Sequence, residues 1–300
     1  MSTEATLEFA AADGYRLSGS LQTPVAPPRA AIVIHPATGV PERLYLPLAR
    51  FLAAHGHAVL TYDYRGIGRS APPSLRGFDA RMRDWMEQDV AGATRVLSAR
   101  FPGVPLLAIG HSVGGHALGI SEASDSLQAA ALIASHAGYI GSIRGWGERM
   151  RVRAMLMQFG PLLVRACGYL PWRRLGLGED LPAGVAREWI AWCRSPGYFF
   201  DDPTLRAQER FAARRLPLLV LGFTDDPWAN PRAIGALVRH FTHCAIERRE
   251  IAPADVGAPA IGHMGFFRQR FSDTLWPQLL AWLDAQLQVA PLPARSAAAT

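Results

Sequence analysis

Lysine is absent from this chain of 300 residues, in which all 31 basic Lys or Arg positions are arginine. The formal net charge is +6 and the sequence pI is about 9.7, values that could suit nucleic acid or an anionic membrane. The arginines are spread along the chain, however, and no nucleic-acid-binding motif accompanies them. A composition rich in arginine, alanine and proline is more typical of genomic base bias, so we expect no nucleic-acid partner. The segment from Arg144 to Arg153 is the one local concentration of positive charge.

Cysteine is scarce, and so are long apolar runs. The three cysteines stand too far apart for a disulfide framework or a zinc site, so we expect them to be packing residues and predict no metal and no cofactor. No uninterrupted apolar run reaches the ~18 residues that a membrane-spanning helix needs. The first residues show no basic region followed by an apolar stretch, as a secretory signal would. Together these absences predict a cytoplasmic chain with no membrane span.

The most informative pattern in the sequence is Gly110-His111-Ser112-Val113-Gly114, a G-x-S-x-G frame. It follows an apolar run typical of a buried strand and precedes small apolar residues that favour a buried helix. A serine on a sharp strand-to-helix turn is held in a strained backbone conformation and needs small neighbours, which the two glycines provide. The first NH groups of the helix would favour an oxyanion that develops near the serine. The pattern therefore predicts that Ser112 is a nucleophile.

A second apolar run, over residues 30–34, predicts a buried strand that ends in the loop from His35 to Gly39. Two backbone NH groups aimed at one point can stabilise a tetrahedral oxyanion. The expected pair is Ala37, from this loop, and Val113, the residue after the nucleophile. Pro36 cannot contribute, because proline has no NH. A plain turn at the end of the strand is the alternative interpretation of this loop.

The acid and the base that would serve Ser112 are predicted late in the chain. A strand over residues 216–222 leads to Asp225 and Asp226, and a carboxylate there would fix the tautomer of a catalytic imidazole. We favour Asp226, which directly precedes a proline, and Asp225 remains the alternative acid. His263 lies in a glycine-flanked loop after the last predicted strand, residues 245–251, and is the expected base. The remaining histidines considered occupy turns or element ends, or flank the nucleophile on a tight turn that directs them elsewhere: His55, His57, His111, His116, His240 and His243.

The order Ser112, Asp226, His263 and the loops around it resemble the α/β-hydrolase superfamily over most of the chain. Within it, the phrases at 35–39 and 261–267 are similar to those of a bacterial group of uncharacterised predicted serine hydrolases. The phrase D-x-R-G-x-G-x-S at 63–70 resembles a loop that is structural or pocket-lining in many lipases, epoxide hydrolases and proline peptidases. The resemblance implies the α/β-hydrolase fold, a mostly parallel doubly wound sheet with an inserted helical cap.

Two departures from the family pattern limit what the resemblance implies. The loop reads His35-Pro36 where many relatives have His-Gly, which leaves Ala37 as the expected donor. The nucleophile is Ser112, whereas dehalogenases and epoxide hydrolases have aspartate and polyester synthases have cysteine at this position. A serine indicates acyl transfer, usually to water.

The alternation of strands and helices predicts a core in two parts, residues 1–137 and 212–290, with a strand at 129–135 and a final helix at 271–287. Residues 138–211 interrupt the alternation with helical apolar spacing and are expected to form the cap. Residues 291–300 are expected to be a flexible tail. Several tryptophans either line an apolar acyl pocket or bury the cap against the core, namely Trp146, Trp172, Trp189 and Trp192 in the cap and Trp228 just beyond it.

The expected function is that of a serine hydrolase acting on an ester or related acyl substrate through a triad and an acyl-enzyme intermediate. Its partner would be a small-molecule acyl substrate, and the sequence does not fix the oligomeric state. A thioesterase, an amidase or an acyltransferase would use the same triad. A non-catalytic ligand-binding protein is the alternative from a different class, because a fold does not fix a function.

Overall fold

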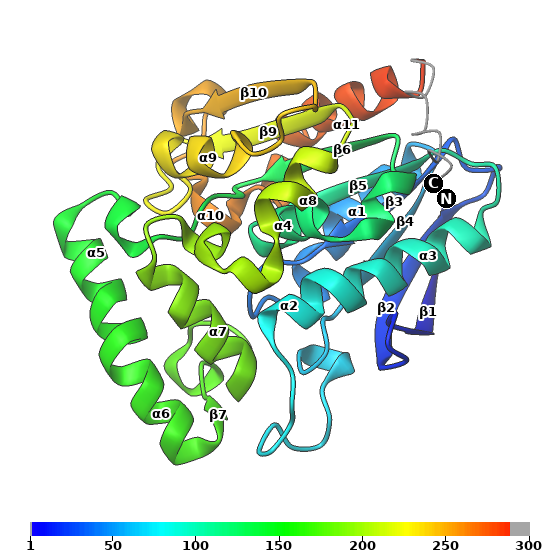
Figure 1. Cartoon of the computed structure of the whole chain (residues 1–300). Coiled ribbons are helices and arrows are strands. Elements are labelled where there is room, and N and C mark those ends of the chain that lie inside the picture. The colour runs from blue at the N-terminus through cyan, green and yellow to red at the C-terminus, as the bar shows by residue number, and fades with distance from the viewer. Residues whose placement is uncertain (1, 289–300) are drawn as a thin grey trace, which may run out of the picture.

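An eight-stranded sheet forms the centre of the computed structural model, which describes residues 2–288. The strand order is β1-β2-β4-β3-β5-β6-β9-β10, and only β2 runs antiparallel to its neighbours. The mostly parallel, doubly wound sheet predicted from the sequence is thus confirmed (Figure 1). The predicted tail at 291–300 lies outside the described residues. The strands are β1 (Ser2–Ala10), β2 (Arg16–Pro24), β3 (Ala30–His35), β4 (His57–Tyr62), β5 (Leu106–His111), β6 (Ala129–Ile133), β9 (Leu218–Phe223) and β10 (Ile246–Ile251).

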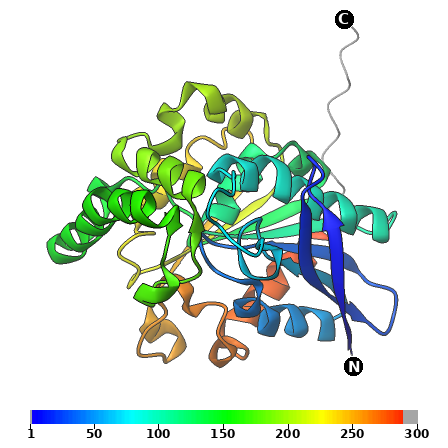
Figure 2. The same cartoon turned by 90° about the horizontal axis from the view of Figure 1, so that it is seen from below.

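Helices cover both faces of this sheet. In Figure 2, α1 and α11 lie on one face, and α3, α4 and α8 lie on the other. Because crossovers between parallel strands place helices on both faces, the central strands are buried on both sides. The helices of the core are α1 (Leu46–Ala54), α2 (Met82–Asp84), α3 (Val90–Arg100), α4 (Val113–Ile120), α8 (Ala207–Ala213), α9 (Pro231–Val238), α10 (Gly262–Gly265) and α11 (Leu275–Gln286).

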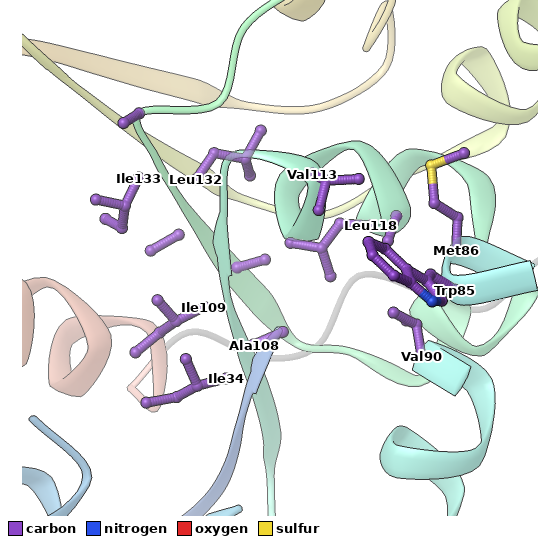
Figure 3. Close-up of a cluster of buried hydrophobic side chains, with 14 of the residues drawn as sticks. Ile34, Trp85, Met86, Val90, Ala108, Ile109, Val113, Leu118, Leu132 and Ile133 are labelled. Atoms are coloured by element: carbon purple, nitrogen blue, oxygen red, sulfur yellow. The ribbon is translucent and has the colours of Figure 1, made fainter. Parts of the chain in front are cut away.

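Apolar side chains from neighbouring strands and from α4 pack around the carboxyl end of β5. The turn that carries Ser112, the predicted nucleophile, begins there. Every residue of β3, β5 and β6 is buried. Figure 3 shows Ala108 and Ile109 of β5 beside Ile34 of β3, while Val113 and Leu118 of α4 point toward a π-helical turn at Trp85–Asp89. The close packing of these side chains makes the end of β5 a rigid platform for the site.

The segment after β6 leaves the sheet and forms a separate group of helices. It contains α5 (Trp146–Arg153), a π-helical turn (Ala154–Phe159), α6 (Gly160–Cys167) and α7 (Ala183–Arg194), together with the short strands β7 (Tyr169–Leu170) and β8 (Leu181–Pro182). Figure 1 shows this group on one side of the molecule, with α7 between the α5–α6 helix and the core. Within residues 2–288, no helix has the length and apolarity needed to cross a membrane.

Several predicted element bounds differ from the structure by a few residues, and two of these differences have a clear local cause. The strand predicted to reach residue 135 ends at Ile133, because Ala134 adopts a φ of 50° and turns the chain away from the sheet. The final helix begins at Leu275 rather than at Phe271, since residues 269–271 form a separate 3-10 turn. The first difference affects the site, because it directs the residues after β6 toward the end of β5.

Candidate active site

Ser112 occupies a strained turn between β5 and α4. Its φ of 51° and ψ of −111° lie where side chains other than glycine are rare. The flanking glycines are required by space, since a Cβ on Gly114 would lie 2.2 Å from the carbonyl oxygen of His35. A Cβ on Gly110 would lie 2.6 Å from the backbone of Gly114. The turn therefore has the geometry of a nucleophile elbow, in which strain presents the serine at the end of a strand.

His263 and Asp226 meet at the opposite side of the same site. Their contact is a hydrogen bond of 2.6 Å between His263 Nδ1 and Asp226 Oδ2. Asp226 is fully buried, and its other oxygen accepts the backbone NH groups of Trp228 (2.9 Å) and Ala229 (3.1 Å). Burial alone would raise the pKa of Asp226, but the charge and hydrogen bond of His263 outweigh it and hold this pKa below its ordinary value. A carboxylate so held can orient an imidazole and stabilise the imidazolium that forms during proton transfer.

Asp225, the alternative acid, bonds to the backbone before His263 and makes no hydrogen bond to the imidazole among the described residues. Its two oxygens accept the backbone NH groups of Ile261 (2.8 Å) and Gly262 (3.0 Å). Gly262 has a φ of 62°, so the loop turns sharply just before the imidazole. Asp225 therefore holds the loop that carries His263, while Asp226 contacts its side chain.

A cavity of about 260 Å³ brings the predicted nucleophile and base together. Ser112 and His263 both line it, and the Ser112 hydroxyl makes no hydrogen bond to any residue between 2 and 288. The hydroxyl is thus open to a ligand. In enzymes without bound substrate, the bond between nucleophile and base is often long and tightens only in the complex.

The NH of Ala37, one of the two expected oxyanion donors, is already used in this structure. It donates to the hydroxyl of Tyr45 at a distance of 2.8 Å, and both residues are buried. An NH paired in this way is not available to an oxyanion. The next residue, Thr38, also lines the cavity, and its NH has no acceptor among the described residues. Val113, the other expected donor, is the first residue of α4, where helix NH groups lack partners within the helix.

A chain of hydrogen bonds runs from the Ala37 loop to the loop of His263. The Tyr45 hydroxyl lies 2.8 Å from Nδ1 of His111, and Nε2 of His111 lies 2.9 Å from the carbonyl oxygen of His263. Because a carbonyl only accepts, Nε2 carries the proton and Nδ1 accepts from the tyrosine. Burial, and then the nearby His263 ring, lower the pKa of His111 far below its ordinary value, so His111 stays neutral. His111 and Tyr45 thus connect the Ala37 loop, the end of β5 beside Ser112 and the His263 loop.

Two further histidines line the cavity, and sequence reasoning passed over both. The position of His116 beside the nucleophile turn predicts that it points elsewhere, but its side chain, from the second turn of α4, lines the cavity with Ser112. His136 carries no motif in the sequence. It follows β6, whose end is bonded to the nucleophile turn through the NH of Ser112 and the carbonyl of Ile133 (3.0 Å). Burial lowers the pKa of His116 to about 3 and, with help from His263, that of His136 to about 4. Ligand sites form at the carboxyl ends of parallel strands, and this rule would have found His136.

The tryptophans of the predicted cap segment and Trp228 divide between the two predicted roles. Trp172 and Trp189 line the cavity together with Trp228. Trp192 is buried and donates through Nε1 to Asp202 (3.1 Å), whereas Trp146 is 73% exposed. The apolar wall of the cavity is therefore largely aromatic. No group of three or more His, Cys, Asp or Glu side chains that could hold a metal ion occurs in residues 2–288.

Comparisons with known proteins agree with this architecture. Residues 32–287 match the description "Alpha/beta hydrolase family". A comparison with curated proteins finds no match. Among solved structures, the chain is similar to an esterase from Pyrococcus furiosus, with 15% identity and a TM-score of 0.61 over 95% of this chain and 93% of that chain.

Two further solved structures show the same likeness. One is the esterase domain of a Rhodothermus marinus protein, with 17% identity and a TM-score of 0.57 over 94% of this chain and 98% of that chain. The other is a serine hydrolase without a lid from Xanthomonas campestris, with 15% identity and a TM-score of 0.53 over 96% of this chain and 97% of that chain. At such identities the likeness shows a shared fold. The family match spans most of the sequence, and the chain therefore belongs to the alpha/beta hydrolase family.

Proposed function

We propose that this protein is a serine hydrolase that cleaves a carboxylic ester or a related acyl substrate. Ser112 is the nucleophile, His263 is the general base and Asp226 is the acid of the triad. The observation that carries the proposal is the 2.6 Å contact between Asp226 and His263, beside a cavity that the strained Ser112 also lines. An imidazole held by a buried carboxylate, in the same cavity as a serine hydroxyl, is the arrangement that activates serine.

In the proposed reaction, Nε2 of His263 takes the proton of the Ser112 hydroxyl as the oxygen attacks the substrate carbonyl. The resulting oxyanion is bound by the backbone NH groups of Val113 and Thr38, the latter in place of Ala37. His263 then gives its proton to the leaving alcohol as the ester C–O bond breaks, which leaves Ser112 acylated. Water, deprotonated by His263, attacks the acyl-enzyme and releases the acid, and the proton returns to Ser112.

The lining of the cavity favours an apolar acyl group. Its walls include Trp172, Trp189, Trp228 and Leu177. Arg151 also lines the cavity, and it pairs with Glu148. The cavity volume of about 260 Å³ lies just below the range of ~300–1,000 Å³ typical of ligand pockets, which favours small acyl groups. We further propose that residues 138–211 act as a cap that selects the substrate, because Trp172, Trp189 and Leu177 come from that segment.

The first test is labelling with a fluorophosphonate, which reacts with an activated serine whatever the substrate is. We expect one adduct, located at Ser112 by peptide mass, and no adduct in Ser112→Ala. Ser98→Ala, a change on the exposed surface of α3, is the matched control and should label as the parent does. An unlabelled parent protein, or a Ser112→Ala variant that still labels or turns over, would contradict the proposal.

A panel of p-nitrophenyl esters and acyl thioesters of increasing chain length then tests the substrate class. We expect kcat/KM to be highest for short acyl chains on esters, because the cavity is small and apolar. A clear preference for thioesters or amides, or transfer to an added alcohol in preference to water, would reassign the reaction while keeping the triad.

A further inference from the structure

The net positive charge of this protein comes from one stretch of the sequence, residues 144–177, where basic residues outnumber acidic ones. This stretch holds seven arginines and one acidic residue, a net charge of +6 that equals the net charge of the whole chain. The other residues together are neutral on this count. The same stretch holds six of the eight large apolar side chains that are exposed among residues 2–288, namely Trp146, Met150, Phe159, Leu162, Leu175 and Leu177. We call residues 144–177 the cationic cap segment.

The fold explains why these apolar side chains are exposed. The helix formed by α5, the π-helical turn and α6 buries one narrow stripe, whose members are four residues apart: Val152, Leu156, Gly160 and Val164. The remaining faces point outward, so that Phe159 is 58% exposed and Leu162 is 64% exposed. Figures 1 and 2 both show this helix along the outer edge of the molecule, with α7 on its inner side. Exposed apolar groups gathered on one element mark an interaction surface.

Most of the arginines on this segment are not neutralised by the protein. Arg151 pairs with Glu148 at 2.7 Å and Arg173 approaches Glu179 at 3.5 Å. Within the described part of the chain, by contrast, no ion pair forms at the five others: Arg144, Arg149, Arg153, Arg165 and Arg174. The segment therefore presents unpaired cations between exposed apolar side chains.

We propose that the cationic cap segment binds the surface of an anionic phospholipid membrane without crossing it. Apolar side chains that enter the lipid interface, flanked by cations that meet lipid phosphates, are the features that hold amphipathic helices on membranes. A second copy of the chain fits poorly, because a symmetric contact would place two surfaces of charge +6 against each other. Nucleic acid fits poorly too, since it offers no apolar surface to cover Phe159 and Leu162.

The cationic cap segment also borders the cavity. Arg151, Met155 and Leu177 line the cavity that contains Ser112. A membrane bound at this segment would lie next to that cavity. The proposal does not rest on the proposed hydrolysis, because membrane binding is measured without turnover.

The test is sedimentation of the full chain with vesicles of phosphatidylcholine, alone or mixed with phosphatidylglycerol. We expect binding to the mixed vesicles and much weaker binding to the neutral ones, with affinity falling as salt is raised. Ser112→Ala should bind as the parent does, so a failure of the proposed catalysis leaves this result readable. Equal binding to both vesicle types, no binding to either, or binding that salt does not change would overturn the proposal.

Paired variants locate the surface. Arg153→Gln with Arg165→Gln should lower the partition coefficient about 25-fold, at roughly five-fold per arginine removed. The matched control is Arg95→Gln with Arg100→Gln, two exposed arginines on α3, which should change it little. Both double variants should hydrolyse a water-soluble ester at the same rate. If the control variant lowers vesicle binding as strongly as the variant of Arg153 and Arg165, the assignment to the cationic cap segment is wrong.

The apolar contribution is tested separately. Phe159→Ala with Leu162→Ala keeps the helix and should weaken binding to mixed vesicles by about ten-fold or more, since each side chain loses burial in the interface. Val25→Ala with Ile246→Ala, two exposed apolar residues elsewhere, is the control. If the Phe159 and Leu162 changes instead abolish a concentration-dependent dimer, the segment binds a second copy of the chain and the proposal is wrong. If the arginine changes abolish oligonucleotide binding while vesicles remain unbound, the segment binds nucleic acid and the proposal is wrong.

Discussion

Replacing Asp226 with asparagine isolates the role of one carboxylate with almost no change in size. In the native site one oxygen of Asp226 accepts from His263 Nδ1, and the other accepts the NH groups of Trp228 and Ala229. Asparagine has only one oxygen, so its amide NH₂ must face a donor on one side or the other. If the oxygen stays with the two backbone groups, the NH₂ faces Nδ1 and favours the tautomer whose proton is on Nε2. That tautomer cannot take a proton from Ser112.

The expected loss is large. Replacing the acid of a comparable triad by asparagine lowers kcat by roughly 10⁴-fold, which corresponds to about 5 kcal/mol of transition-state stabilisation. We expect a loss of this size for Asp226→Asn, with KM little changed, because Asp226 does not line the cavity. The same change at Asp225 leaves one oxygen to accept from Ile261 or Gly262. It should lower kcat by less than about ten-fold and the free energy of unfolding by about 1–3 kcal/mol.

The assay is steady-state hydrolysis of a short p-nitrophenyl ester, with the rate of fluorophosphonate labelling as a second readout that needs no turnover. Circular dichroism and urea unfolding confirm that each variant is folded. If Asp226→Asn retains activity within ten-fold of the parent, or if Asp225→Asn is the more damaging change, the reasoning is refuted and the acid must be reassigned.

Two further predictions concern the buried polar groups behind the site. Tyr45→Phe removes the hydroxyl that pairs with the Ala37 NH and with His111. The free energy of unfolding measured with urea should therefore fall by about 2–4 kcal/mol. A loss below about 1 kcal/mol would contradict the hydrogen-bond chain. Burial, together with the nearby charge of Asp63, raises the pKa of Glu42 from its ordinary value of 4.5 to about 7. The folded state therefore keeps a proton that the unfolded chain releases at lower pH. The free energy of unfolding should therefore fall as the pH rises from 4.5 to about 7. Glu42→Gln should reduce this fall by at most about 3 kcal/mol, as measured by urea unfolding across this pH range. An unchanged pH dependence would show that Glu42 is ionised throughout.

The sequence predicted the parts of the fold that depend on local physics. The G-x-S-x-G phrase requires a turn in which Gly110 and Gly114 leave no room for a Cβ, and the structure has that turn with a positive φ at Ser112. Buried strands with apolar runs predicted a mostly parallel sheet, and that sheet is present. The placement of His263 in a glycine-flanked loop late in the chain likewise put it in the same cavity as Ser112. In each case a short run of adjacent residues indicates the local structure.

Tertiary structure decided the points that depend on which distant groups meet. Asp225 and Asp226 are neighbours with the same chemistry, and only the direction of each side chain separates the one that contacts His263 from the one that holds its loop. The Ala37 NH is occupied because Tyr45, eight residues away at the start of a helix, reaches back to it. The charge of residues 144–177 can be counted from the sequence, but the exposure of apolar side chains in the same stretch cannot. A local pattern records what the backbone needs at one position, whereas hydrogen-bond partners and exposed faces are set by side chains that only the folded chain brings together.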